Sequence, residues 1–556
     1  MSNRFKFNAA ALIALWAAGG AIAAALCSGC KNNRYDEAGG GAPAPVSLTV
    51  VHDPFVSGYL KAQLALFHTA EPNIAGGRKV QIRLLELPEL AAADQIATGK
   101  IKADAWVTPS RALVKYLNSK VVNLGSKQVD CKQIFGSPVI LATRPENLWR
   151  GADGVQPSWN DIFAAPAAEN PDRAPAQAKA VLYHGLPFAA PGGLPALINL
   201  AAIAIAGGLE IFDLPACTAV DCFGRLQQLE QSAEAYSADE QALLARAALP
   251  PGDFRRFVLT TEQMMIRYNQ SAPADKRLAA LYLAEGSFWQ DYSLCRAEAD
   301  WMTPDRRAAL RLLADFLILE PAQRAAMALG FRPARLEGVS GPPLTKEWGV
   351  SPDLPKLSIL PPSAELTAEL ISRWPELRRP AAMVFVIDSS NSMQGAALET
   401  VRSEIRNYIA QRGPRDQTAI IAASSQAALL SDFTSDRERL EAALNRIEAI
   451  GGAAFYDGLN LAVQLFNRNQ LPNHRRILVA VVDGDDKSSE ISQPLLVSAI
   501  GNTLSHKDIS LLIIGIRDQG LRSEPLNEIA AAGRGALKLV TVSGLRAALE
   551  QLPTSF

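Results

Sequence analysis

Two loops near the C-terminal end of the chain carry oxygen ligands of the kind that bind a small divalent cation. Asp388, Ser390 and Ser392 alternate directly after an apolar segment, so one carboxylate and two hydroxyls can converge on a single point. Asp483 follows a second apolar segment in the same way, and a glycine-rich turn at 451–458 lies between the two loops in the sequence. Carboxylate and hydroxyl oxygens are hard ligands that suit Mg²⁺, which keeps several of its waters when it binds to protein. The spacing therefore predicts a magnesium site.

A serine-rich loop after a strand also has a simpler interpretation, because serine and aspartate side chains cap the first turn of a following helix. The surrounding elements favour the metal site. Apolar runs predict strands over residues 383–387, 418–422, 477–482, 510–515 and 537–540, with helices over 396–411, 437–450, 455–467, 494–504, 525–532 and 543–552. This alternation predicts a doubly wound, mainly parallel α/β sheet, and such sheets bind ligands at the carboxyl ends of their strands.

The C-terminal region, residues 380–556, resembles a von Willebrand factor type A (VWA) domain, which has a Rossmann-like fold. Asp388, Ser390 and Ser392 match the Asp-x-Ser-x-Ser motif of its metal-ion-dependent adhesion site (MIDAS), and Asp483 matches its distal aspartate. The resemblance implies a cofactor, Mg²⁺ or else Mn²⁺ or Ca²⁺, and a protein partner whose acidic residue completes the coordination of the cation.

The chain departs from the family pattern at one position. The family usually has threonine after the Gly-Gly turn, and this chain has Ala453 there. The missing hydroxyl removes one metal ligand. Water can replace it with weaker affinity, or the site can be silent.

The preceding region, residues 46–334, also alternates strands and helices. Strands are predicted over 47–51, 80–85, 103–107, 137–142 and 180–183, with a helix over 55–68. The region resembles a bacterial extracellular solute-binding protein of the type 2 periplasmic class. The segments that carry this resemblance, in order, are Val50–Phe55, Ala103–Arg111, Phe135–Ala142, Trp159–Phe163, Ala189–Ala196, Thr260–Gln263 and Glu285–Trp289. The resemblance implies a two-lobed α/β domain that takes up a small-molecule solute.

Ligand contacts in such a domain are expected at helix starts and strand ends, where backbone N–H groups are free. The candidates are His52, Asp53, Ser110, Gly192, Gly193 and Glu262. Each also has a purely structural interpretation, because serine and aspartate cap helices, glycine permits tight turns and glutamate complements a helix dipole. No cluster of arginine or lysine marks this region, so an oxyanion solute is not favoured.

The first 30 residues are predicted to be an export signal. Arg4 and Lys6 precede a long uncharged, alanine-rich stretch, and Ser-Gly precedes Cys30. This resembles a bacterial lipoprotein signal with lipidation at Cys30. An uncleaved anchor helix and an ordinary cleaved signal are the alternatives. All three place the rest of the chain outside the cytoplasmic membrane, behind a flexible tether at 31–45.

Two further features concern the covalent and domain organisation. The proline-rich stretch 335–379 is predicted to be a semi-rigid linker between the two regions. Four cysteines follow the signal, and an exported compartment permits disulfides. Three pairings are possible, of which Cys217–Cys222 with Cys131–Cys295 contains the local pair, and free buried thiols are the alternative.

Composition narrows the classes of function. The formal net charge is −1, which argues against bulk nucleic-acid binding because phosphate neutralisation needs an excess of cations. No short catalytic motif is present, so we do not expect an enzyme. The sequence favours a membrane-anchored protein that binds a protein partner through its VWA domain. The alternative is a transport-associated lipoprotein that binds or senses a solute, with the VWA domain as the signalling or assembly module.

Overall fold

The computed structural model describes residues 43–122, 125–148, 155–163, 179–187, 189–205, 211–250, 254–334, 341–353, 355–469, 471, 473–507, 509–517, 521–533 and 535–550. The predicted export signal with Cys30, and most of the predicted tether, lie outside these residues.

The N-terminal part of the chain forms a twelve-stranded sheet. Its main path runs β2 (Asn73–Ile74), β3 (Arg78–Glu86), β1 (Val46–His52), β4 (Ala105–Thr108), β10 (Ser287–Glu298), β5 (Lys127–Thr143), β8 (Phe254–Thr261), β6 (Lys179–Gly185) and β7 (Ala233–Ser237). The short strands β9 (Ala279–Leu281), β11 (Arg332–Pro333) and β12 (Ser358–Ile359) pair beside this path. β1 is parallel to both β3 and β4, so the loops after these strands share one edge of the sheet.

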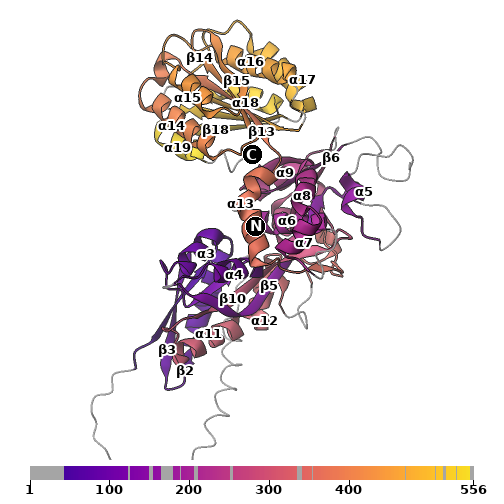
Figure 1. Ribbon diagram of the computed structural model, residues 1–556, viewed down its shortest axis with the longest axis vertical. Coiled ribbons are helices and arrows are strands. Elements are labelled where there is room, and N and C mark those ends of the chain that lie inside the picture. Colours follow the sequence, from indigo (N-terminus) through magenta and orange to yellow (C-terminus); the bar gives the residue numbers. More distant parts are fainter. Residues whose placement is uncertain are drawn as a thin grey trace, which may run out of the picture.

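Two long antiparallel strands, β5 and β10, run through this sheet and divide it into two lobes (Figure 1). The first lobe holds β1 to β4 with α2 (Ser57–Thr69), α3 (Glu89–Ala97), α4 (Arg111–Ser119), α11 (Pro304–Leu317) and α12 (Glu320–Ala328). The second holds β6 to β8 with α5 (Trp159–Phe163), α6 (Gly193–Ile205), α7 (Leu214–Ala219), α8 (Cys222–Glu230), α9 (Glu240–Ala247) and α10 (Glu262–Ser271). The predicted two-lobed α/β architecture is confirmed.

The apolar residues 194–205 form most of α6, whose side chains are buried on nearly all sides in the second lobe. An all-round apolar helix of this length is typical of a protein core. Within the described ranges, no helix combines the length and apolar composition needed to cross a membrane.

The predicted linker contains a helix, α13 (Ala364–Leu377), which packs against both lobes. Ser363 caps its first turn by accepting a hydrogen bond from the Leu366 amide. Leu366, Leu370 and Trp374 recur at helical spacing and join the core formed with α4 and α8. Proline content predicted a semi-rigid connector, and within it the apolar stripe of α13 packs against the two lobes.

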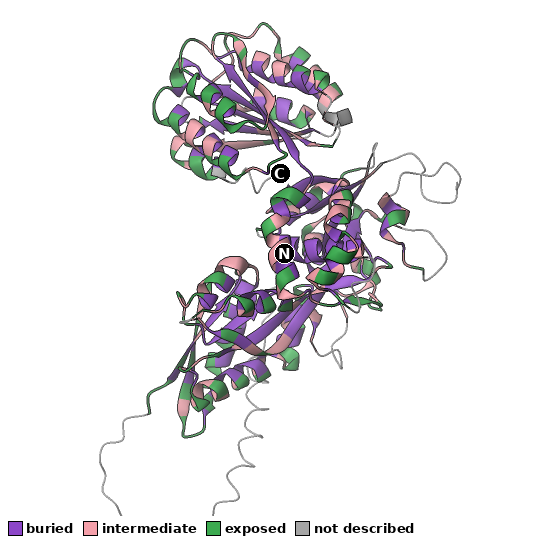
Figure 2. Ribbon diagram, in the orientation of Figure 1, coloured by how far each residue is buried: buried purple, intermediate pink, exposed green. Residues whose placement is uncertain are grey.

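The C-terminal part of the chain forms a six-stranded sheet whose central strands are buried between two layers of helices (Figure 2). The order is β15 (Ala427–Thr434), β14 (Gln417–Ala423), β13 (Ala381–Asp388), β16 (Arg475–Val482), β17 (Ile509–Ile516) and β18 (Ala536–Val540). One face carries α14 (Ala396–Gln411), α15 (Arg437–Asn445) and α19 (Val542–Glu550), and the other carries α16 (Phe455–Arg468), α17 (Gln493–Lys507) and α18 (Ser523–Ala532). All pairings are parallel except that of the edge strand β15.

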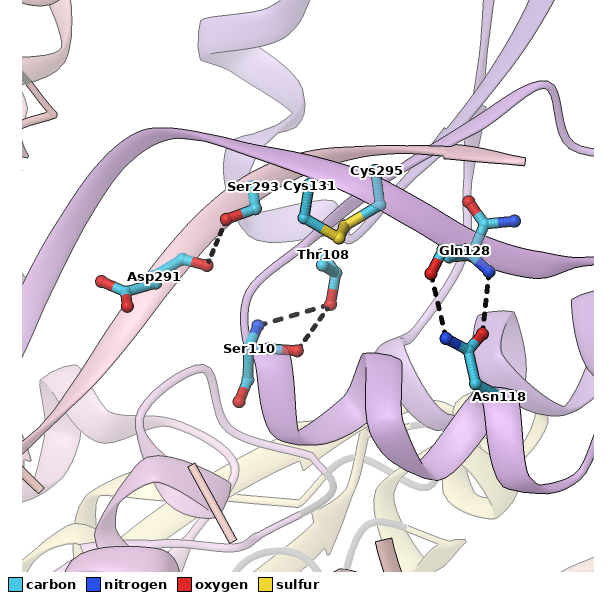
Figure 3. The surroundings of a disulfide bond; sticks show 8 residues. All are labelled: Thr108, Ser110, Asn118, Gln128, Cys131, Asp291, Ser293 and Cys295. Atoms are coloured by element: carbon cyan, nitrogen blue, oxygen red, sulfur yellow. Dashed lines mark hydrogen bonds between the residues drawn. A yellow bond between two sulfur atoms is a disulfide. The ribbon is translucent and has the colours of Figure 1, made fainter. Parts of the chain in front are cut away.

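Both disulfides in the structure lie in the N-terminal part. Cys131 on β5 is bonded to Cys295 on β10, and Cys217 is bonded to Cys222 between α7 and α8. The first bond crosslinks the two strands that run through both lobes, next to the start of α4 (Figure 3).

A buried polar contact joins the second lobe to the C-terminal sheet. The Arg379 guanidinium lies 2.9 Å from the Glu234 carboxylate and donates to the Ala233 carbonyl at 3.0 Å. It also donates to the Asn473 carbonyl at 3.3 Å, just before β16. The backbone N–H of Arg379 donates to the Tyr236 hydroxyl at 3.0 Å. One largely buried arginine therefore bonds to both parts of the chain.

Candidate functional site

The four predicted metal ligands lie together at the carboxyl ends of β13 and β16. These strands are neighbours in parallel register, which places Asp388 and Asp483 at one edge of the sheet. The Ser392 hydroxyl donates to Asp483 Oδ1 at 2.7 Å, and the Ser390 and Ser392 hydroxyl oxygens are 2.9 Å apart. The Ser390 amide donates to Asp388 Oδ1 at 2.9 Å. Two loops separated by about ninety residues thus form one continuous polar cluster.

Burial makes this cluster electrostatically unusual. Asp388 is fully buried and Asp483 is 1% exposed. Burial, together with the negative charge of Asp483, raises the pKa of Asp388 to about 6. Burial likewise raises the pKa of Asp483. Asp483 Oδ2 is buried without a hydrogen-bond partner among the described residues. Two buried carboxyls with an unpaired oxygen form a donor set that a cation would satisfy.

The glycine turn is held directly against this cluster. Asn391 bonds twice to Gly451, through its side-chain oxygen and through its own amide, each at 3.1 Å. Gly451 has φ +76°, and a Cβ there would lie 2.1 Å from the Ser425 hydroxyl, so only glycine fits. The Ala453 carbonyl accepts the amides of Lys487 and Ser488. The turn therefore lies between the other two loops, although Ala453 supplies no hydroxyl.

Residues that the sequence analysis did not identify hold the loop after Asp483 against the start of α16. Asp486 accepts a hydrogen bond from the Tyr456 amide at 2.7 Å. The Asp457 carboxylate accepts the amides of Glu490 and Ile491. Their signal in the sequence was only a local excess of aspartate and serine, which is also typical of ordinary loops.

A comparison with known families identifies the C-terminal region. Residues 383–485 match the family model described as the von Willebrand factor type A domain. The C-terminal region contains a VWA domain. The matched segment includes all four predicted ligands and the glycine turn. VWA domains commonly mediate protein–protein interactions, which is consistent with a protein partner for this chain.

The curated relatives match less than a third of this chain. An uncharacterized protein of Synechocystis sp. is 26% identical over 165 residues, which is 29% of this chain and 38% of the relative. Inter-alpha-trypsin inhibitor heavy chain H4 of Sus scrofa is 30% identical over 119 residues, 20% of this chain and 13% of the relative. The chain thus spans well under half of these curated relatives. A solved periplasmic thiamin binding protein covers 61% of this chain and 99% of its own length, with a TM-score of 0.39 and 12% identity.

The predicted ligand contacts of the N-terminal region have different roles. Ser110 caps α4 by accepting the Ala112 amide at 3.1 Å, and its backbone bonds to the Thr108 hydroxyl (Figure 3). The Glu262 carboxylate is held by Arg332 at 2.8 Å and by the Tyr282 hydroxyl. The side chains of Ser110 and Glu262 therefore form hydrogen bonds within the fold.

The other four candidates lie at strand ends or helix starts. His52 ends β1, and its Nδ1 is 2.7 Å from the Asp53 carbonyl oxygen. Asp53 caps the short helix that follows. A Cβ on Gly193 would lie 2.2 Å from the Leu186 carbonyl, so this glycine permits close packing at the start of α6. Gly192 donates its amide to Glu240, a residue that the sequence analysis did not single out.

Proposed function

We propose that this protein is an extracytoplasmic, membrane-anchored binding protein that holds a protein partner through a divalent cation on its VWA domain. The cation would be Mg²⁺, Mn²⁺ or Ca²⁺, held by Asp388, Ser390, Ser392 and Asp483. The observation that carries the proposal is the contact between the 388–392 loop and Asp483, with Asp483 Oδ2 buried and unpaired. A helix cap alone would need no such contact between distant loops.

A bound divalent cation with an incomplete protein shell offers an open position and uncompensated positive charge to a carboxylate. Hydrogen bonds within the chain hold the proposed metal ligands in position. The hydroxyls of Ser390 and Ser392 are already fixed by their mutual contact. The Asp388 carboxylate is oriented by the amides of Ser390 and Asp483, the latter at 3.4 Å. We therefore propose that an acidic side chain of the partner completes the site.

Replacing Ala453 by threonine should strengthen cation binding. The change restores the hydroxyl that the family usually has on the glycine turn, and one added oxygen ligand should tighten Mg²⁺ binding by roughly ten-fold. Isothermal titration of both proteins with Mg²⁺ measures the effect. Unchanged affinity in a folded Ala453→Thr variant would show that this position does not face the cation.

The partner function is tested by capture from an envelope extract with the tagged, anchorless chain in Mg²⁺ buffer. Proteins retained by the wild type should be lost with Asp388→Ala and with a chelator, and retained by Asp432→Asn, which removes a carboxylate on β15. Capture that survives both Asp388→Ala and the chelator would contradict a metal-dependent interface.

Membrane attachment is a separate part of the proposal and rests on the sequence before residue 31. Lipidation at Cys30 requires its thiol, so Cys30→Ala should release the protein into the soluble fraction. Retention of the Cys30→Ala protein would favour an uncleaved anchor helix instead.

A second function is favoured by the N-terminal part, where buried polar groups gather between the lobes. Asp53 Oδ2 and Gln290 Oε1 are buried without hydrogen-bond partners among the described residues. Unsatisfied buried acceptors are costly unless a ligand completes them. We propose that the lobe pair captures a small solute and that the VWA domain acts as the signalling or assembly module.

A further inference from the structure

We propose that the junction between the two lobes binds a small organic cation with N–H donors, such as a primary amine. The binding groups are Asp53, Glu89 and Gln290, with Glu240 as a further carboxyl. The proposal rests on the solute-capture function above and names the chemical class of the solute.

Asp53 supplies the acidic group from the first lobe. It lies directly after β1 and is 3% exposed. Its Oδ1 accepts the Phe55 amide at 2.7 Å, which fixes the carboxyl plane. Oδ2 makes no hydrogen bond of normal geometry among the described residues, and the Tyr292 hydroxyl is the side chain that acts on the same carboxyl. Glu89 begins α3 in the same lobe, and the residue as a whole is partly buried.

The second lobe contributes Glu240 in a fixed position. Its Oε2 accepts the Gly192 amide at 2.8 Å, and its Oε1 accepts the Thr260 hydroxyl at 2.7 Å. A Cβ on Gly192 would lie 2.4 Å from Glu240 Oε1, so glycine allows this close approach. Glu240 is 1% exposed, and its charge acts on Glu89 of the first lobe. The acidic groups of the two lobes are thus close enough to interact.

Gln290 is the independent observation that points to a ligand. It lies on β10 between the lobes and is fully buried. Its Nε2 donates to the Pro191 carbonyl at 2.7 Å, one residue before Gly192, and lies 3.5 Å from the Tyr292 hydroxyl. Burial raises the pKa of the Tyr292 hydroxyl, and the negative charges of Asp53, Glu89 and Glu240 add to this effect. The unpaired Gln290 Oε1 is therefore an acceptor placed beside the acidic groups.

The carboxyls at this junction indicate the chemical class of the ligand. Burial raises the pKa of Asp53 to about 7 and that of Glu89 well above its usual range, and the charges of Asp53 and Glu240 raise the latter further. No lysine or arginine is among the groups that shift the pKa values of these three carboxyls. In the described part of the chain, no three carboxylate, histidine or cysteine side chains are arranged to hold a metal ion. Carboxyls that are costly to ionise alone, beside unpaired acceptors and without an internal cation, match an ammonium-type ligand, because its positive charge would favour their ionised form.

The same carboxyls predict a pH dependence of stability. Carboxyls with raised pKa values bind protons more tightly when folded, so stability should fall as the pH rises from about 5 through 7 to 8. The other titratable groups acting on them are Tyr292, His184 and Asp239. Glu89→Gln should flatten this dependence and stabilise the free protein at pH 8, because it removes one of the like charges. Urea unfolding at both pH values measures it. Destabilisation by Glu89→Gln at pH 8 would mean that the carboxyls serve the fold, and would overturn the proposal.

Ligand class is tested by melting and titration of the full mature chain with matched probes. The cations are ethanolamine, putrescine and agmatine. The uncharged isosteres are ethylene glycol and 1,4-butanediol, and succinate and Ca²⁺ complete the set. We expect at least one amine to raise the melting temperature while its isostere, succinate and Ca²⁺ do not. Glu89→Gln should weaken amine binding roughly ten-fold or more. Glu71→Gln, which removes an exposed carboxylate of the same lobe, should leave binding unchanged.

The remaining outcomes separate the two proposals. A shift with an uncharged compound or succinate alone would overturn the cationic class and leave solute capture standing. Stabilisation by Ca²⁺ that depends on Glu89 would make the ligand a metal instead of an amine. Absence of any shift across the whole set would overturn both the cationic class and solute capture.

Discussion

Mg²⁺ should stabilise the full chain by about 2.7 kcal/mol when its concentration is a hundred-fold above the dissociation constant, because a ligand that binds only the folded state shifts the unfolding equilibrium. Asp483→Asn should abolish this gain. Asparagine still accepts the Ser392 hydroxyl through its oxygen, but it offers an amide N–H₂ where the unpaired Asp483 Oδ2 faces the site. Chemical denaturation with and without Mg²⁺ measures the effect.

Two controls make this result specific. Asp432→Asn removes a partly exposed carboxylate on β15 that pairs with Arg468, and it should retain the full response to Mg²⁺. Asp483→Asn should also be at least as stable as the wild type without Mg²⁺, because it relieves repulsion between two buried acids. Equal stabilisation of the wild type and Asp483→Asn would exclude these loops as the binding site.

Arg379→Ala should destabilise the chain by roughly 3–5 kcal/mol, because removing one partner of a buried ion pair leaves the other charge uncompensated. Glu234, which is as buried as Arg379, would lose its guanidinium partner. The carbonyls of Ala233 and Asn473 would lose a donor at the same time. These bonds of Arg379 join the second lobe to the C-terminal sheet. Without them, the two parts of the chain should unfold independently.

The chain offers a direct way to see this uncoupling. All eight tryptophans precede residue 380, so tryptophan fluorescence reports the N-terminal part alone, while far-UV circular dichroism reports both parts. The two signals should coincide in the wild type and separate in Arg379→Ala. Arg437→Ala, which breaks an exposed pair with Glu441 on α15, should cost less than about 0.5 kcal/mol. Coincident, unshifted transitions in Arg379→Ala would contradict the structural role of this contact.

The sequence predicted β13, β14, β16 and β17 well because each is an apolar run covered on both faces. The predicted bounds of the helix at 396–411 agree with α14. The edge strand β15 (Ala427–Thr434) was missed because most of its residues are only partly buried and its pattern is weak. The clustering of Asp388, Ser390, Ser392 and Asp483 was predictable, since each follows a buried strand at the same sheet edge.

The junction between the lobes could not be predicted in the same way. Glu89 and Glu240 begin helices in different lobes, and such glutamates are ordinary at helix starts. Only the tertiary fold brings their charges together. Ser110 and Glu262 were candidates from local context, and in the structure the first caps α4 and the second pairs with Arg332.

The helix α13 has a mechanical consequence. It rests on α4 of the first lobe and α8 of the second, and the chain continues from its last turn into β13, which ends at Asp388. A rotation of one lobe against the other would therefore break the contact of α13 with α4 or with α8. Any hinge motion between the lobes would therefore also move the end of α13 from which the chain enters β13, the strand that ends at Asp388.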